Sequence, residues 1–261
     1  MQFHVYFPPQ SDKCKVPLLI WLSDREENGA AFMQESGILH YASEHGLAIL
    51  APDTSPREIV IPDAHNEDGL GPGHAFYVDA TQSPWAYYYN MYGYISQELP
   101  ALMQQQFPQF LPGFAISGFG MGGHGALILG LRNPEVFRSI SAFAPICTPM
   151  HCRWGEKALS HYLGYDRDKW KPYDAVALIE QAQSTTPLLI EQGTEDAYLT
   201  QQLKLSALET MCARKHHPLT VNLRQGYDHS YQFVATFLQN HVQYHLNTLH
   251  AESTSHTSPI N

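Results

Sequence analysis

The sequence predicts an α/β fold with a mostly parallel sheet and helices on both faces. Short apolar runs typical of buried strands alternate along the chain with longer segments of helical spacing. The apolar runs are nearly continuous, as expected for parallel strands that are covered on both faces. Candidate functional residues follow three of these runs, and in open parallel sheets sites gather beyond the carboxyl ends of the strands.

In the first half of the chain, each apolar run ends at a recognisable stop. Residues 3–7 alternate weakly before a pair of prolines, which predicts an edge strand. The further expected elements are buried strands at 17–22 and 47–50, and helices at 31–45 and 86–106. Between them, residues 54–84 form a long irregular segment rich in Gly, Pro and Asp. Loops of this length are usually functional or disordered, and the aromatic residues here favour an ordered, packed loop.

The second half repeats the alternation. The expected strands are 114–117, 137–144, 188–191 and 219–224, and the expected helices are 125–131, a short one within 147–171, 174–183, 199–215 and 231–249.

The length of the chain, 261 residues, is usual for one α/β domain, and hydrophobic residues make up 44% of it, enough for a large core. No repeat or linker divides it, so we expect a single domain over residues 1–250. Residues 251–261 are polar and rich in Ser and Thr, which predicts a disordered tail.

Charge and hydropathy exclude several classes of partner. The formal net charge of −10 disfavours binding to nucleic acid or to anionic membrane surfaces. No apolar run approaches the length of a transmembrane helix, and the first residues lack the basic start and long apolar run of a signal peptide. We therefore expect a cytoplasmic protein.

The four cysteines do not form a C-x-x-C pair. His151 lies between Cys147 and Cys152, an arrangement that suggests a metal, but no second pair of ligands accompanies it. We expect reduced thiols and no bound metal.

Residues 113–134 carry the central motif: an apolar strand, a glycine-rich turn and an apolar helix. This layout is shared by two functional devices. The nucleophile elbow, G-x-S-x-G, matches at Gly118 and Gly122, but its central position holds Gly120, which has no side chain to attack with. The dinucleotide fingerprint, G-x-G-x-x-G, matches at Gly118, Gly120 and Gly123.

The rest of the chain favours the elbow. A dinucleotide site would need an acidic residue at the end of the next strand, and the residues there, 142–145, include no carboxylate. Asp196 and His229 follow later strands, which gives the order nucleophile, acid, base of α/β-hydrolases, with Asp196 orienting His229. Taken singly, Asp196 also fits a helix N-cap, and His229 a surface or satisfied histidine.

Several segments resemble the S-formylglutathione hydrolases, also called esterase D, a family of α/β-hydrolases. The resemblance runs from about Phe3 to His245. The matching segments are Ser43-Glu44-His45-Gly46-Leu47, Ala51-Pro52-Asp53-Thr54-Ser55-Pro56-Arg57, Met121-Gly122-Gly123-His124-Gly125-Ala126-Leu127, Ser141-Ala142-Phe143-Ala144-Pro145-Ile146-Cys147, Trp154-Gly155-Glu156-Lys157 and Gln225-Gly226-Tyr227-Asp228-His229-Ser230-Tyr231.

The resemblance implies an α/β-hydrolase fold and a cytosolic serine hydrolase of formaldehyde detoxification. Such enzymes cleave S-formylglutathione to glutathione and formate, use no cofactor and are often dimers. The implied ligand is a small thioester or ester, including a glutathione conjugate. By resemblance, Asp196 is the acid, His229 the base and the backbone N–H of Met121 an oxyanion donor, while Trp85 and Trp154 lie near the substrate.

The chain also departs from the family. Gly120 stands where the family has serine, and Ser117 and Ser230 are not placed to replace it. After Ser23 the family has Gly-Leu-Thr-Cys-Thr, which includes the second oxyanion donor, whereas this chain has Asp24-Arg25-Glu26-Glu27-Asn28. The chain is also N-terminally short for the family, because it lacks the leading strands that members usually carry.

These departures predict a protein that is inactive or strongly impaired as a serine hydrolase, in which Asp24 and Arg25 belong to a degenerate oxyanion loop. Three alternatives stay open. The protein is a hydrolase with residual turnover, in which His229 activates water in the space that the serine vacated. It is a pseudoenzyme that binds a thioester, glutathione or a partner subunit. Or it is an engineered nucleophile variant of an active hydrolase.

Overall fold

The computed structural model describes residues 1–25, 27–59, 61, 69–181 and 184–255, with side chains up to residue 250. Within them one sheet is formed by the strands β1 (Phe3–Tyr6), β2 (Leu18–Leu22), β3 (Ala48–Pro52), β4 (Phe114–Gly118), β5 (Phe137–Phe143), β6 (Leu188–Gly193) and β7 (Leu219–Arg224). Their order is β1-β3-β2-β4-β5-β6-β7. β1 is antiparallel to β3, and every other pair is parallel. The predicted fold class is confirmed.

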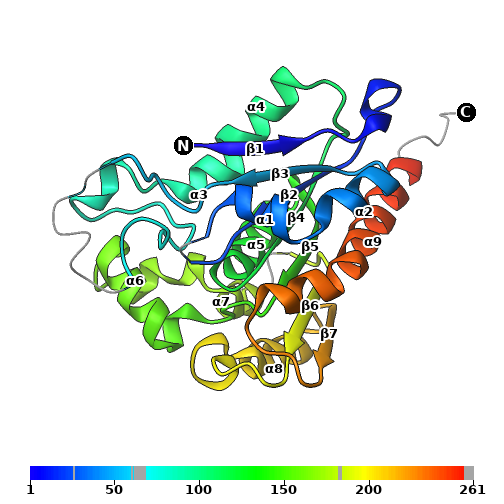
Figure 1. The fold of residues 1–261 in the computed structure, drawn as a ribbon. Helices are drawn as coiled ribbons and strands as arrows, with labels where there is room; N and C mark the ends of the chain where they lie inside the picture. Colours follow the sequence, from blue (N-terminus) through cyan, green and yellow to red (C-terminus); the bar gives the residue numbers. More distant parts are fainter. Residues whose placement is uncertain (26, 60, 62–68, 182–183, 256–261) are drawn as a thin grey trace, which may run out of the picture.

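Helices cover both faces of this sheet (Figure 1). Successive side chains of β5 point to opposite faces of the sheet and so identify the helices on each face. Ser139 and Ser141 hydrogen-bond to His245 of α9 (Tyr231–Ser255). Ile140 between them points the other way, toward Gly130 of α5 (Met121–Arg132).

Each face carries further helices. α1 (Gly29–Glu35) and α2 (Ile38–His45) lie on the side of α9, because α2 contacts both α1 and α9. On the opposite side, α7 (Ala175–Glu180) packs against α5 and α8 (Leu205–Lys215). α6 (Arg153–Leu163) belongs to the excursion that follows β5.

Three expected helices are interrupted. The segment 31–45 is divided at Gly37, which has a left-handed φ of 74°. The segment 199–215 begins with a π-helical turn, Leu199–Leu203, and is divided at Lys204, with φ 57°. The spacing of hydrophobic residues does not reveal a helix break of a single residue. At position 204 the residue is also lysine, whereas most left-handed positions are marked by glycine.

The segment 86–106 is interrupted in another way. A 3-10 turn, Trp85–Tyr87, comes first. The helix then runs from α3 (Met91–Gly93) through a π-helical turn at Tyr94–Glu98 to α4 (Leu99–Gln106).

The long segment 54–84 is packed where it is described. Its residues Phe76 and Tyr77 are buried although both have positive φ, 50° and 52°. Residues 60 and 62–68 of this segment lie outside the described residues. At the C-terminus, α9 continues to Ser255, so residues 251–255 of the expected disordered tail are helical, since extending an existing helix costs less than starting one. Residues 256–261 lie outside the described residues.

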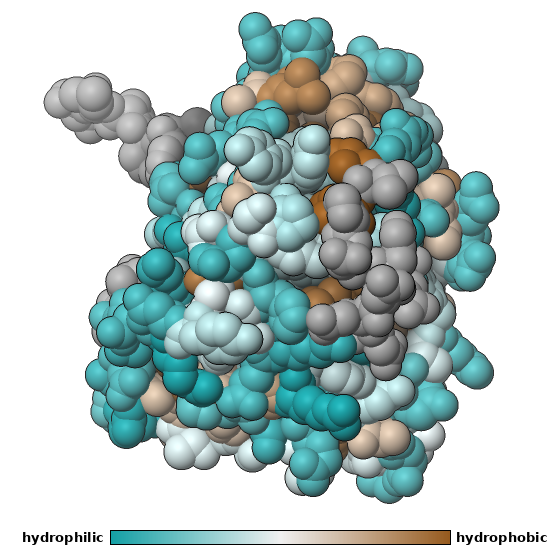
Figure 2. Space-filling view, turned by 90° about the vertical axis from the view of Figure 1, so that its left-hand side faces the viewer, coloured by the Kyte–Doolittle hydropathy of each residue, from teal (hydrophilic) through white to brown (hydrophobic). Residues whose placement is uncertain are grey.

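The side of the molecule that carries α6 is mainly hydrophilic in Figure 2, and hydrophobic residues gather toward the top of that view and beside the grey residues. Among the described residues, no helix combines the length and the apolar composition needed to cross a membrane.

Candidate active site

The turn between β4 and α5 has the backbone of a strained elbow. Gly120 has φ 55° and ψ −112°, which L-residues rarely adopt. Its N–H donates to the carbonyl oxygen of Phe143 over 3.0 Å. The helix then passes so close to β2 that a Cβ on Gly122 would lie 1.9 Å from the carbonyl oxygen of Leu22. The elbow predicted from the glycine spacing is therefore formed, with Gly120 at its apex.

The carboxylate of Asp24 lies where a side chain on residue 120 would be. Asp24 follows β2 and is 8% exposed. A Cβ on Gly120 would lie 2.3 Å from its Oδ1 and 2.6 Å from its Oδ2. Oδ1 also accepts a hydrogen bond of 2.7 Å from the backbone N–H of Met121, the first residue of α5. The carboxylate thus sits on a helix N-terminus, which favours negative charge.

His229 and Asp196 meet as the sequence predicts. Asp196 follows β6, and His229 lies between β7 and α9. His229 Nδ1 is 2.7 Å from Asp196 Oδ2. The other oxygen of Asp196 accepts the Tyr198 N–H over 2.8 Å, which fixes the carboxylate.

The second nitrogen of the imidazole faces Asp24. His229 Nε2 is 3.3 Å from Asp24 Oδ2. Burial alone would lower the pKa of His229, but the hydrogen bonds and charges of Asp196 and Asp24 outweigh it and raise that pKa to about 9. At neutral pH the imidazole is therefore an imidazolium that donates to a carboxylate on each side.

Aromatic rings enclose this group. Phe119 stacks on His229 with 4.4 Å between ring centroids, and Tyr198 meets it edge-on. Trp154 packs against Tyr198 at 4.6 Å, and the guanidinium of Arg25 lies 3.5 Å from the centroid of the Trp154 ring. Trp154 and Arg25 are therefore connected to His229 through Tyr198.

Trp85 lies elsewhere. Its ring contacts among the described residues are with Tyr89 and Tyr162, and it is buried in their aromatic cluster. Its described ring contacts therefore do not include the rings around His229, and a contact of Trp85 with substrate stays a prediction.

Two residues near the site were not predicted. The hydroxyl of Tyr77 donates to the carbonyl oxygen of Ser23 over 2.9 Å and so holds the residue before Asp24. Glu27 Oε2 accepts the backbone N–H of Asp24 over 3.3 Å. Burial and the charge of Asp24 raise the pKa of Glu27 to about 7. The run of charged residues after Ser23 could have identified Glu27 as a residue near the site. Nothing in the sequence indicates the left-handed backbone that orients Tyr77.

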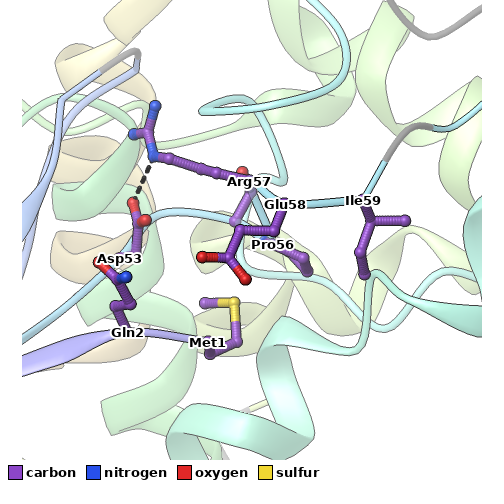
Figure 3. A pocket seen from close by; sticks show the side chains of 8 residues that line it. Met1, Gln2, Asp53, Pro56, Arg57, Glu58 and Ile59 are labelled. Carbon is purple, nitrogen blue, oxygen red and sulfur yellow. Dashed lines mark hydrogen bonds and ion pairs between the residues drawn. The ribbon is translucent and has the colours of Figure 1, made fainter.

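Arg57 anchors the same loop from the side. Its guanidinium donates to the carbonyl oxygen of Glu27 and pairs with Asp53 at 2.7 Å. Figure 3 shows this ion pair beside a pocket of about 350 Å³. The pocket is lined by Met1, Gln2, Asp53, Ser55, Pro56, Arg57, Glu58 and Ile59, so it does not include the imidazole or its two carboxylates.

No metal centre is formed by the part of the chain that the structure describes: no three His, Cys, Asp or Glu side chains are grouped to hold an ion. Cys147 and Cys152, which the sequence placed beside His151, are buried free thiols.

Comparisons with known proteins identify the family of this chain. A family model described as "Esterase: Putative esterase" matches residues 1–244. The S-formylglutathione hydrolase of Mus musculus is 46% identical over 253 residues, which cover 96% of this chain and 90% of that protein. The chain belongs to the S-formylglutathione hydrolase family. The resemblance found in the sequence is thereby confirmed.

Solved structures with similar folds include two S-formylglutathione hydrolases. An S-formylglutathione hydrolase from Agrobacterium tumefaciens is 40% identical, with a TM-score of 0.91 over 95% of this chain and 89% of that one. One from Staphylococcus aureus is 18% identical, with a TM-score of 0.68 over 94% of this chain and 92% of that one, and shows the fold alone.

The alternative of water activation by His229 uses the space beside Gly120. The carboxylate of Asp24 lies in this space, since a Cβ on residue 120 would be 2.3 Å from Asp24 Oδ1. The sequence places negative charge in this loop, but the side-chain direction of Asp24 depends on the tertiary contact with the Met121 N–H.

Proposed function

We propose that this chain is an S-formylglutathione hydrolase-like protein that lacks the serine route of its family and is a pseudoenzyme toward thioesters and esters. Gly120, at the apex of the elbow, carries the proposal. By resemblance this is the nucleophile position, and glycine cannot form an acyl-enzyme there.

Two further features support the proposal. The Met121 N–H, which by resemblance is an oxyanion donor, already donates to Asp24 Oδ1. Removal of one such donor typically costs about 10²–10³ in rate. A general base needs a free lone pair at His229 Nε2, whereas the raised pKa keeps this nitrogen protonated at neutral pH.

The remaining turnover is expected to be small. When a member of a catalytic triad is lost, about 10³–10⁴-fold acceleration over water remains, from the oxyanion hole and binding. Here the oxyanion donor is also engaged, so we expect less than that.

The test is hydrolysis of S-formylglutathione and of a p-nitrophenyl ester by the unaltered protein and by His229→Ala. We expect the two proteins to be equally slow and neither to be labelled by a fluorophosphonate probe. Enzyme-like turnover that falls with His229→Ala, together with covalent labelling by the probe, would refute the proposal.

A further inference from the structure

Asp24 has the placement of an attacking group. Its Oδ1 is held by the Met121 N–H, and its Oδ2 faces His229 Nε2 at 3.3 Å. The imidazole is backed in turn by Asp196 at 2.7 Å. This is the arrangement of a nucleophile, a base and an orienting acid, with the nucleophile supplied from the loop after β2 instead of from the elbow.

We propose that the Asp24 carboxylate acts as a nucleophile toward an electrophilic sp³ carbon, such as that of a primary alkyl halide. Carboxylate side chains are established nucleophiles that form covalent ester intermediates in other enzymes. The inference uses the position of Asp24 and does not depend on the substrate of the family.

The choice of an sp³ carbon follows from the hydrogen bond to Oδ1. Attack on an acyl carbon places negative charge on the oxygen of the substrate carbonyl, and the N–H of Met121 is not free to stabilise it. Displacement at an sp³ carbon creates no such oxyanion, because the negative charge leaves with the departing group. The resting hydrogen bond therefore hinders acyl transfer and permits substitution.

In the first step, Asp24 Oδ2 forms a bond to the carbon, and the carbon–halogen bond breaks with both electrons going to halide. The product is an alkyl ester of Asp24. Once Asp24 is esterified, the His229 imidazolium loses its proton to solvent. In the second step, the neutral imidazole takes a proton from water, and the water oxygen attacks Asp24 Cγ. The oxyanion then develops on Oδ1, where the N–H of Met121 already donates. Collapse of this intermediate releases the alcohol, which receives its proton from His229. The proton left on the Asp24 carboxyl then passes to His229, which restores the carboxylate and the imidazolium, and the net release is the one proton lost earlier to solvent.

The two carboxylates around His229 fit this sequence. In the resting protein the imidazolium is stabilised by both Asp24 and Asp196. Esterification removes the charge of Asp24 and therefore lowers the pKa of His229. The imidazole thus becomes able to accept a proton only after the alkyl group is attached.

The test is incubation with 1-bromobutane, followed by measurement of bromide release and by peptide mass mapping. Cys14 is an exposed thiol that would alkylate by itself, so all proteins carry Cys14→Ser. We expect the His229→Gln variant, which cannot activate water, to accumulate one butyl group on the peptide containing Asp24. The matched variant Asp24→Asn should carry no butyl group on that peptide and release no bromide above the background.

A second measurement does not depend on the folding of a variant. Repeated turnover of the protein with Asp24 and His229 intact in ¹⁸O-labelled water should place ¹⁸O in the Asp24 carboxylate, because water attacks Cγ. Absence of the butyl group from that peptide in folded His229→Gln, or absence of ¹⁸O from Asp24, would overturn the inference and leave Asp24 as a group that only blocks the elbow. Either result is independent of turnover of S-formylglutathione, so the two proposals fail separately.

Discussion

The position of the Asp24 carboxylate depends on the glycine at residue 120. A Cβ on residue 120 would lie within 2.3 Å of Asp24 Oδ1, a separation that non-bonded atoms do not reach. Asp24 keeps its present conformation only beside a glycine, because a side chain at residue 120 and the carboxylate would compete for the same space.

This relationship predicts the result of restoring a serine. We expect Gly120→Ser alone to leave S-formylglutathione hydrolysis close to that of the unaltered protein, because the new side chain and Asp24 compete for one space. The double variant Asp24→Gly with Gly120→Ser frees the Met121 N–H and should exceed the single variant by about 10²–10³ in rate. Equal activity of the single and double variants would show that Asp24 moves aside without cost.

The charge state of His229 gives a second prediction. A titration followed by NMR should find its pKa near 9 in the unaltered protein and lower in Asp24→Asn, which keeps the shape of the side chain but removes its charge. Because the folded pKa lies above the ordinary value near 6.5, the stabilisation it supplies is fully present below pH 6.5 and is lost as the pH rises through about 9. The urea concentration at the unfolding midpoint of the unaltered protein should therefore fall between pH 6.5 and about pH 9. The midpoint of Asp24→Asn should fall less over the same pH range. A His229 pKa unchanged by Asp24→Asn would contradict the contact.

Glu27 also makes stability fall as the pH rises, but over a lower range and because its charged form is disfavoured. Burial raises its pKa to about 7, whereas the unfolded chain ionises near the ordinary value of 4.5. The native carboxyl therefore costs stability progressively as the pH rises from about 4.5 to about 7, and the cost is constant above that. Glu27→Gln removes this titration and keeps an oxygen that accepts the Asp24 N–H. In urea unfolding, the free energy of unfolding of the variant should increase relative to that of the unaltered protein as the pH rises between these limits. A difference that stays constant at all pH values would contradict the raised pKa of Glu27.

The acid limit should come from histidines beneath the sheet. Burial, together with the neighbouring His241, holds the pKa of His245 well below its ordinary value, and its two nitrogens are satisfied by Ser139 and Ser141 over 2.8 Å each. Below about pH 6.5 the unfolded chain binds a proton that native His245 does not, so stability falls with pH by up to about 1.4 kcal/mol per pH unit for this group. His245→Gln should flatten this slope in urea unfolding, whatever its effect at pH 7. An unchanged slope would assign the acid sensitivity to other groups.

The sequence predicts much of this fold and of the site, because both depend on local patterns and on chain order. The buried strands follow from apolar runs, and the elbow follows from Gly118 and Gly122, whose spacing reflects the close approach of α5 to β2. The pairing of Asp196 with His229 follows from their positions after parallel strands.

What the sequence cannot predict depends on the direction of individual side chains. The charge of Asp24 was identified near the expected oxyanion site, but its contact with the Met121 N–H and with His229 requires the loop after β2 to be placed to within an ångström. Tyr77 holds that loop from a left-handed residue 54 positions along the chain, for which neither spacing nor composition gives a signal.

The contact between Asp24 and Gly120 also constrains the order in which mutations can accumulate. A chain with serine at residue 120 cannot admit this conformation of Asp24, so loss of the side chain at 120 is the permissive change and the aspartate in its present pose is the dependent one. Once both are in place, return of serine alone meets a steric conflict, and reversion needs two substitutions together. The two positions are thus epistatic: Asp24 in its present conformation makes the loss of the side chain at residue 120 difficult to reverse.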